Sequence, residues 1–124
     1  MSKDKIISAI KESRDGINKV LDNQETIGNI QKAAELIVET ISNKSKIFSC
    51  GNGGSMCDAM HFSEELSGRF RENRRGLSAV SISDPSYLTC VANDFGFEYV
   101  FSRFMEANSK AGDLILAIST SGKS

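Results

Sequence analysis

Apolar residues recur at helical spacing over the first 43 residues, in two separate segments. The apolar positions of the first segment are Ile6, Ile7, Ile10, Ile17, Val20 and Leu21. Those of the second segment are Ile27, Ile30, Ala33, Ala34, Ile37, Val38 and Ile41. Spacings of three and four residues place each set on one face of a helix, and the polar residues 22–24 separate the two. The chain is therefore predicted to open with two amphipathic helices, the second closing at residues 43–45.

From residue 46 onward, short apolar runs alternate with helical patterns. Strands are predicted at residues 46–50, 77–82 and 114–118, and helices at residues 55–66, 84–91 and 98–107. The first of these helices is expected to carry Asp58 in its first turn and to end at Gly68. Strands that alternate with helices predict an α/β fold, a doubly wound parallel sheet that binds ligands beyond the carboxyl ends of its strands.

The predicted sheet has only three strands, and the last one runs into Ser119–Ser124, where a helix is expected to begin. A three-stranded parallel sheet leaves an apolar edge exposed. We therefore expect residues 1–124 to be the N-terminal portion of a single domain, a truncated chain. Residues 1–43 are predicted to be a helical assembly segment and residues 46–124 the first βα units. Chain beyond Ser124, or another chain, is expected to complete the sheet.

Composition and charge narrow the possible functions. Fifteen Lys and Arg against sixteen Asp and Glu give a formal net charge of −1, too small for a broad field that attracts nucleic acid or anionic membranes. No apolar run approaches the length of a membrane span, and no export signal opens the chain. We expect a cytoplasmic protein that binds neither nucleic acid nor membrane, and that holds any bound anion locally.

The three cysteines are Cys50, Cys57 and Cys90. An odd number without C-x-x-C spacing argues against a disulfide framework or a structural zinc knuckle. All three are predicted to be reduced, buried thiols, because a free cysteine usually behaves as a small core residue.

Two loops of small residues follow predicted strands, and in a parallel sheet both lie on the same rim. The hydroxyls of Ser119, Thr120, Ser121 and Ser124, with the N–H groups of a helix start, could cradle a phosphate, or could form an ordinary serine-rich turn. The other loop, Gly51–Ser55, fits neither G-x-G-x-x-G nor the P-loop, which disfavours nucleotide binding. It either lets the backbone approach a ligand or is a structural turn.

His61 and Glu65 stand four residues apart, on one face of the predicted helix. They could share a metal or a substrate, although zinc needs further ligands. The residues alone favour a plain helix ion pair. Glu64 lies about 100° round the helix and is expected to face solvent or an adjacent element.

Two further polar groups leave their roles open. Asp94, which follows Asn93 at the end of a predicted helix, could accept hydrogen bonds from sugar hydroxyls or cap the next helix. Four arginines cluster after the helix of His61, interrupted by Glu72, and a solvated loop or a subunit contact is the default interpretation. These arginines are Arg69, Arg71, Arg74 and Arg75.

Four segments together resemble the phosphoheptose isomerase family. They are residues 49–55 (SCGNGGS), 61–69 (HFSEELSGR), 93–96 (NDFG) and 118–124 (ISTSGKS). The resemblance spans nearly the whole chain, and the order and spacing of the segments agree. It implies a sugar isomerase (SIS) domain with a flavodoxin-like three-layer αβα fold. It also implies a homotetramer with active sites between subunits, for which the opening helices would serve assembly.

The resemblance also implies a reaction and a set of site residues. The family converts sedoheptulose 7-phosphate to D-glycero-D-manno-heptose 7-phosphate, towards the ADP-heptose of lipopolysaccharide cores. The implied zinc ligands in this segment are His61 and Glu65. The remaining zinc ligands and the acid partner of the family, a glutamine and a histidine, belong to a later helix. The implied substrate contacts are Asn52, Gly53, Gly54, Glu65, Asn93, Asp94, Ser119, Thr120, Ser121 and Ser124.

The chemistry of such an isomerisation points to a carboxylate base. Moving a carbonyl from C2 to C1 requires removal of a C1 proton, stabilisation of an enediolate and reprotonation at C2. Glu65 is the candidate catalytic base. Two alternatives are a noncatalytic SIS-type module that senses a sugar phosphate or binds a protein, and an isomerase of another phosphorylated ketose.

Overall fold

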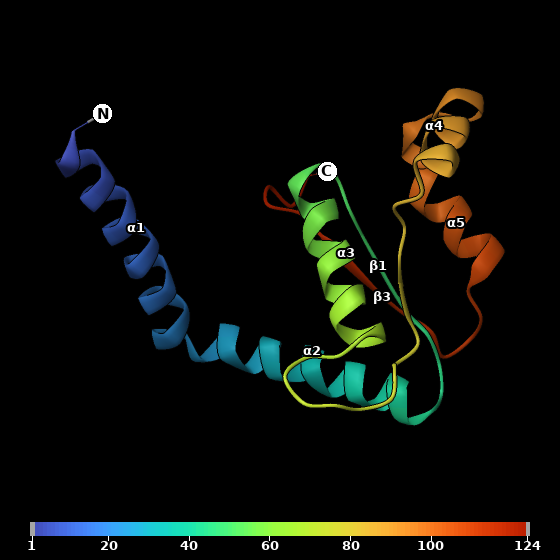
Figure 1. Cartoon of the computed structure of the whole chain (residues 1–124), viewed down its shortest axis with the longest axis horizontal. Coiled ribbons are helices and arrows are strands. Elements are labelled where there is room, and N and C mark those ends of the chain that lie inside the picture. Colours follow the sequence, from blue (N-terminus) through green and yellow to red (C-terminus); the bar gives the residue numbers. More distant parts are fainter. Residues whose placement is uncertain (1, 124) are drawn as a thin grey trace. The chain divides into compact units, whose positions relative to one another are not determined.

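The computed structural model describes residues 2–123 and divides into two compact units, residues 1–36 and 37–124. The first unit contains α1 (Lys3–Asp22) and the beginning of α2 (Gln24–Ser42), which continues into the second unit. The second unit then runs through the remaining elements (Figure 1). These are β1 (Ile47–Gly51), α3 (Gly54–Ser67), β2 (Ala79–Ser81), α4 (Pro85–Asp94), the 3-10 helix η1 (Phe97–Tyr99), α5 (Val100–Asn108) and β3 (Leu114–Ile118). The two predicted opening helices are confirmed.

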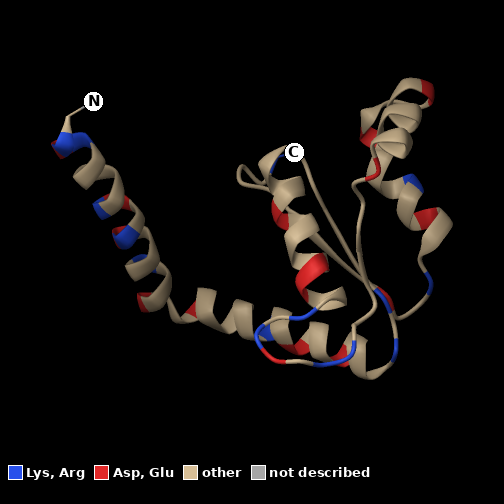
Figure 2. Cartoon of the chain, in the orientation of Figure 1, with Lys and Arg blue, Asp and Glu red and all other residues tan. Residues whose placement is uncertain are grey.

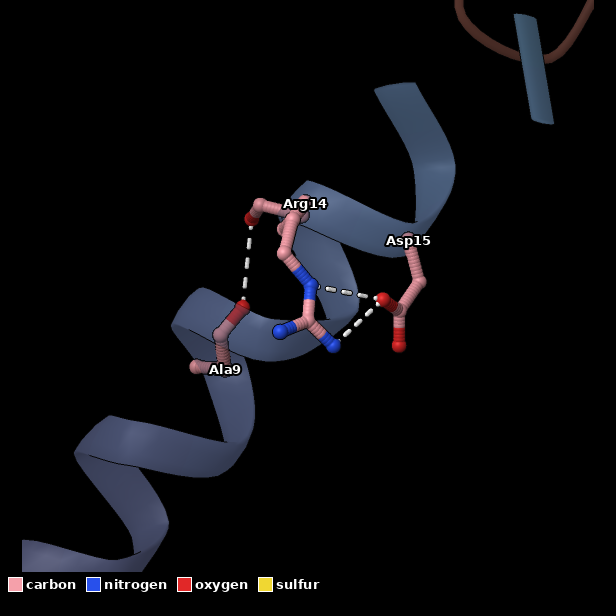
Figure 3. Close-up of polar contacts among 4 residues, drawn as sticks. Ala9, Arg14 and Asp15 are labelled. Carbon is pink, nitrogen blue, oxygen red and sulfur yellow. Dashed lines mark hydrogen bonds and ion pairs between the residues drawn. The ribbon is translucent and has the colours of Figure 1, made fainter. Parts of the chain in front are cut away.

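The first helix, α1, has no buried residue. Its apolar stripe is exposed, with Ile10 at 65% and Ile17 at 63%. Charged residues of both signs lie along the same helix (Figure 2), and Arg14 donates two hydrogen bonds to Asp15 (Figure 3). An exposed pair of this kind contributes at most about 1 kcal/mol. The helix therefore has an exposed apolar face as well as a charged one.

The three strands form one parallel sheet, as predicted, and their order in it is β2-β1-β3. The central strand β1 is buried at every position, and Ile47 and Phe48 are fully inaccessible. It pairs with β3 along its whole length, from Ile47 opposite Leu114 to Gly51 opposite Ile118. The pairing with β2 is shorter because β2 contains only residues 79–81 of the predicted 77–82. The apolar run of β1 thus forms the middle of the core.

Helices cover the two faces of the sheet. Ser49 of β1 bonds to α3, whereas its neighbour Phe48 packs edge-on against Phe104 of α5 at 6.2 Å between ring centroids. Tyr87 of α4 also makes an edge-to-face contact with the Phe104 ring, at 5.1 Å between ring centroids. Because adjacent strand residues point to opposite faces, α3 lies on one face and α4 with α5 on the other. The predicted doubly wound, three-layer αβα arrangement is confirmed.

Local predictions were wrong at two helix starts. The α3 helix begins at Gly54, so that Asp58 lies in the second turn and the first turn holds no acidic residue. The predicted helix 98–107 is a 3-10 turn followed by α5, because Gly96 with a φ of 107° introduces a tight turn first.

The prediction of three buried cysteines holds only for Cys50. Burial raises the pKa of the Cys50 thiol. Cys57 and Cys90 are exposed. Cys57 lies off the buried face of α3, which consists of Ser55, Ala59 and Ser63 at four-residue spacing.

The described part of the chain, residues 2–123, contains no helix that is both long and apolar enough to span a membrane.

Asp113 connects the starts of two strands. Its carboxylate accepts hydrogen bonds from the backbone N–H of Lys46 (2.8 Å) and of Lys110 (2.9 Å). The Lys46 carbonyl in turn accepts from the N–H of Leu114 (3.0 Å). The Lys46 N–H is the main reason why the pKa of Asp113 lies below its ordinary value. The ionised carboxylate therefore stabilises the end of the sheet at which β1 and β3 begin.

The Asp113→Asn variant should lower the free energy of unfolding by about 1 kcal/mol at neutral pH, because the amide cannot satisfy both donors. A lowered pKa stabilises the fold above the unfolded-state value of about 4, and this stabilisation disappears as the pH falls through the lower folded-state value. Urea unfolding from pH 8 to pH 3 should show the two proteins converging below about pH 4. The exposed Glu12→Gln is the control, and an equal difference at all pH values would contradict the assignment.

Candidate functional site

The strand order places two loops at one rim of the sheet. The chain leaves β1 towards α3 and β2, whereas β3 lies on the other side of β1. The strand order reverses at β1, because β2 lies on one side of it and β3 on the other, and such a switch point is the usual position of ligands in open parallel sheets. Gly51 pairs with Ile118 at the carboxyl ends of these two strands. The predicted glycine and serine loops therefore begin side by side.

The glycine loop depends on the absence of side chains at two positions. A Cβ on Gly51 would lie 2.6 Å from the backbone carbonyl of Ser55, so that the chain can turn into α3 only with glycine there. Gly53 has a φ of 55° and a ψ of −120°, which residues with a Cβ rarely adopt. Between them, Oδ1 of Asn52 is buried and has no hydrogen-bond partner among the described residues. A buried polar atom of this kind is a mark of a ligand or water site.

The serine loop after β3 is an exposed turn in the described residues. Ser119 Oγ accepts a hydrogen bond from the Gly122 N–H (2.9 Å), and Ser121 Oγ accepts one from the Lys123 N–H (3.2 Å). Gly122 has a φ of 68°. The hydroxyls thus stabilise their own turn, as in the serine-rich turn that was the alternative interpretation. Ser124, the last predicted phosphate contact, lies outside the described residues.

One buried serine sets the position of α3. Ser49 is fully inaccessible; its Oγ donates to the Ala59 carbonyl (2.7 Å) and shares a hydrogen bond with Ser63 Oγ (2.8 Å). Ala59 and Ser63 lie on the face of α3 that meets the sheet. His61 and Glu65 therefore lie off the face of α3 that packs against the sheet.

His61 and Glu65 meet as their spacing predicts. The His61 Nε2 and Glu65 Oε1 atoms lie 3.1 Å apart. Glu64 is exposed, as expected, yet its carboxylate belongs to the same cluster, in which one ligand atom from each residue lies within 4.8 Å of the others. Glu64 was not predicted as a ligand, although its spacing of three residues from His61 places the two side chains near each other on the helix surface.

A pocket of about 550 Å³ adjoins this cluster. Its lining includes His61 and Glu65 together with the apolar side chains of Phe62 and Phe70. Arg74 also lines it, which corrects the solvated-loop interpretation for this arginine, whereas Arg69, Arg71 and Arg75 are exposed. The Arg74 guanidinium is half-buried and bonds to the carbonyls of Glu65 (2.7 Å) and Leu66 (2.9 Å).

Asn93 and Asp94 end α4, as predicted, and both are exposed. Asp94 does not cap the next helix, because the N-cap of η1 is Gly96 and no side chain caps it. Its carboxylate instead accepts from Asn93 Nδ2 (2.9 Å) and from the Cys90 thiol (3.5 Å). The hydrogen bond between the Cys90 thiol and Asp94 is the main reason why the pKa of Cys90 lies above its ordinary value.

Comparison with known proteins identifies the family. The SIS domain family matches residues 10–124. The chain belongs to this SIS domain family. The fold of this SIS domain is also similar to solved structures of a phosphoheptose isomerase from Neisseria gonorrhoeae, with a TM-score of 0.89 and 36% identity, and of one from Francisella tularensis, with 0.88 and 30%. These matches cover 98% and 97% of this chain, and 62% and 63% of those chains.

Curated relatives of this SIS domain carry the same name. Phosphoheptose isomerases from Photorhabdus laumondii subsp. laumondii and Vibrio vulnificus are 55% and 52% identical over the 124 residues. The chain spans 64% and 65% of the length of these two relatives.

The glycine loop of this SIS domain gives a matched pair of variants. Gly51→Ala should lower the free energy of unfolding by about 1 to 3 kcal/mol, because its Cβ would overlap the Ser55 backbone. Gly54→Ala should change it by less than about 1 kcal/mol, because its Cβ would meet nothing within 4 Å at the start of α3. Denaturant unfolding measures both, and equal losses would contradict the proposed contact.

Proposed function

We propose that the complete protein is an aldose-ketose isomerase that converts sedoheptulose 7-phosphate to D-glycero-D-manno-heptose 7-phosphate. The observation that carries the proposal is the His61–Glu65 pair beside a pocket on α3, the helix that leaves the switch-point loop of a SIS domain. Relatives named phosphoheptose isomerase at 52–55% identity support this choice of substrate. The direct test is coupled detection of the aldose product from a panel of phosphorylated ketoses.

The rim loops would hold the substrate. Asn52, Gly53 and Gly54 would contact the sugar, and the partnerless Oδ1 of Asn52 supports this because it can accept a hydrogen bond from a hydroxyl. The phosphate would lie at the serine loop, where short side chains and backbone N–H groups can surround an anion. The proposed phosphate contacts are Ser119, Thr120, Ser121 and Ser124. Asn93 and Asp94 would bond to the sugar hydroxyls.

Glu65 would act as the base. The carboxylate removes the proton from C1 of the ketose, and the electron pair of the broken C–H bond forms the C1–C2 double bond of the enediolate. The C2 carbonyl oxygen takes up the displaced electron pair, and the proton of the C1 hydroxyl moves to that oxygen. Return of a proton to C2 then leaves the carbonyl at C1, with no net oxidation. Glu65 is only partly exposed, beside the apolar wall of the pocket. The Glu65 side chain thus lies against an apolar wall while part of it stays open to solvent.

The cluster on α3 fits part of a zinc site. His61, Glu64 and Glu65 present one nitrogen and two carboxylates within 4.8 Å, a donor set that zinc accepts. His61 and Glu65 would be the ligands from this segment. Bound zinc would supply a Lewis acid that stabilises the negative oxygen of the enediolate.

Assembly and cellular role follow from the same proposal. A homotetramer with active sites between subunits would cover the exposed apolar stripe of α1, since contiguous apolar surface of this kind marks interaction sites. The product would enter heptose synthesis for lipopolysaccharide in the cytoplasm.

Glu65→Gln should lower kcat for sedoheptulose 7-phosphate by at least about a hundredfold, the usual contribution of a general base. The amide keeps the shape of the side chain but cannot accept the proton. Steady-state kinetics on the complete protein measure the effect. Glu72→Gln in the exposed loop is the matched control, and unchanged turnover in Glu65→Gln would refute the base assignment.

Zinc binding can be measured without turnover. After dialysis the complete protein should retain about one zinc ion per chain, and His61→Ala should lose most of it because a nitrogen ligand is removed. Elemental analysis of the dialysed proteins gives the zinc content. Glu72→Gln should keep its zinc, and equal zinc in the wild type and in His61→Ala would contradict the site.

A further inference from the structure

Arg74 is bonded to the end of the helix that carries the site. Its Nη2 donates to the Glu65 carbonyl (2.7 Å), and its Nη1 donates to the Leu66 carbonyl (2.9 Å). The same Nη1 lies 3.0 Å from the carbonyl of Arg75 and 3.4 Å from that of Gly68. One guanidinium therefore contacts both the last turn of α3 and the returning loop. Figure 2 shows the basic residues of this loop beyond α3.

These carbonyls need partners from outside the helix. The last four C=O groups of an α-helix have no intrahelical donor, and they form the negative end of its dipole. In α3 the Glu64 carbonyl is satisfied by the Gly68 N–H (2.7 Å). The Leu66 carbonyl also accepts from the Leu77 N–H (3.0 Å). Arg74 adds a charged, forked donor, which matches two adjacent carbonyls in a way that a lysine ammonium cannot.

The charge of Arg74 is directed at the backbone. Among residues 2–123, Arg74 forms no ion pair with a carboxylate. It lines the same pocket as His61 and Glu65, yet its hydrogen bonds go to the main chain of Glu65 rather than to the side chain. Its effect on the site therefore acts through the backbone position of Glu65.

We propose that Arg74 is a positioning residue, which holds the last turn of α3 so that the Glu65 carboxylate stays at the His61 side of the pocket. This inference rests on the proposed function, since it gives Glu65 the role of base. At the other end of the buried face, Ser49 fixes α3 through Ala59 and Ser63. Beyond Ser63, the other hydrogen bonds to the last turn come from the N–H groups of Gly68 and Leu77 and, at 3.4 Å, from Ser67 Oγ.

The test is Arg74→Lys in the complete protein, with Arg75→Lys as the matched control. Arg75 is the next residue and is exposed. Arg74→Lys keeps the positive charge but loses the paired N–H donors of the guanidinium. We therefore expect kcat to fall between about tenfold and a hundredfold, while KM changes less than about twofold. Both variants are assayed well below their unfolding temperatures. Hydrogen exchange of the Gly68 N–H should become at least about tenfold faster in Arg74→Lys only.

The outcomes separate positioning from simple stabilisation. If Arg74→Lys lowers the unfolding temperature but keeps the wild-type kcat, Arg74 only stabilises the helix end and the inference is overturned. If the wild-type protein does not isomerise the ketose, the proposed function fails by itself. In that case, hydrogen exchange of the Gly68 N–H and the NMR signals of the His61 ring test the positioning role of Arg74. Changes in both in Arg74→Lys, absent in Arg75→Lys, support the positioning role, and anything less overturns it.

Discussion

The close seating of α3 on β1 is the constraint on which the rest of the site depends. Ser49 is fully buried in the centre of the sheet, and its hydroxyl is satisfied by the Ala59 carbonyl and by Ser63 Oγ. A buried hydroxyl without partners is costly, so that these two hydrogen bonds fix both the depth and the rotation of the helix. The small side chains of the buried face let the helix approach closely. The rotation of α3 on the sheet consequently sets the direction in which the His61 and Glu65 side chains point.

The strand order adds the second constraint. Because β1 lies between β2 and β3, its loop and the loop after β3 open at one rim. The glycine loop is shaped by backbone contact at Gly51 and by a positive φ at Gly53. Its one buried, partnerless side-chain atom belongs to Asn52. A polar rim beside a helix that carries a carboxylate at a pocket is an arrangement suited to a small phosphorylated molecule.

Much of this could be predicted from the residues alone. The apolar run 46–50 predicted a buried strand, and the four-residue spacing of His61 and Glu65 predicted their contact. The exposure of Cys57 could not be predicted, because apolar character does not tell which face of a helix meets a sheet. Arg74 was missed for a different reason. Its partners are backbone carbonyls, which leave no mark in the pattern of side chains.

The local structure of the serine loop could not be predicted from the sequence either. Hydroxyls at Ser119 and Ser121 are compatible both with an anion and with the turn that they stabilise here. Composition does not separate the two, because the same oxygen can accept from its own backbone and donate to a ligand.

The most direct test of the central claim is the reaction itself in deuterated water. The complete protein is incubated with sedoheptulose 7-phosphate, and NMR follows the aldose and the hydrogen at its C2. Proton transfer by a carboxylate open to exchange predicts an aldose that carries solvent deuterium at C2. Absence of the aldose, or an aldose with no solvent deuterium at C2, would contradict the account.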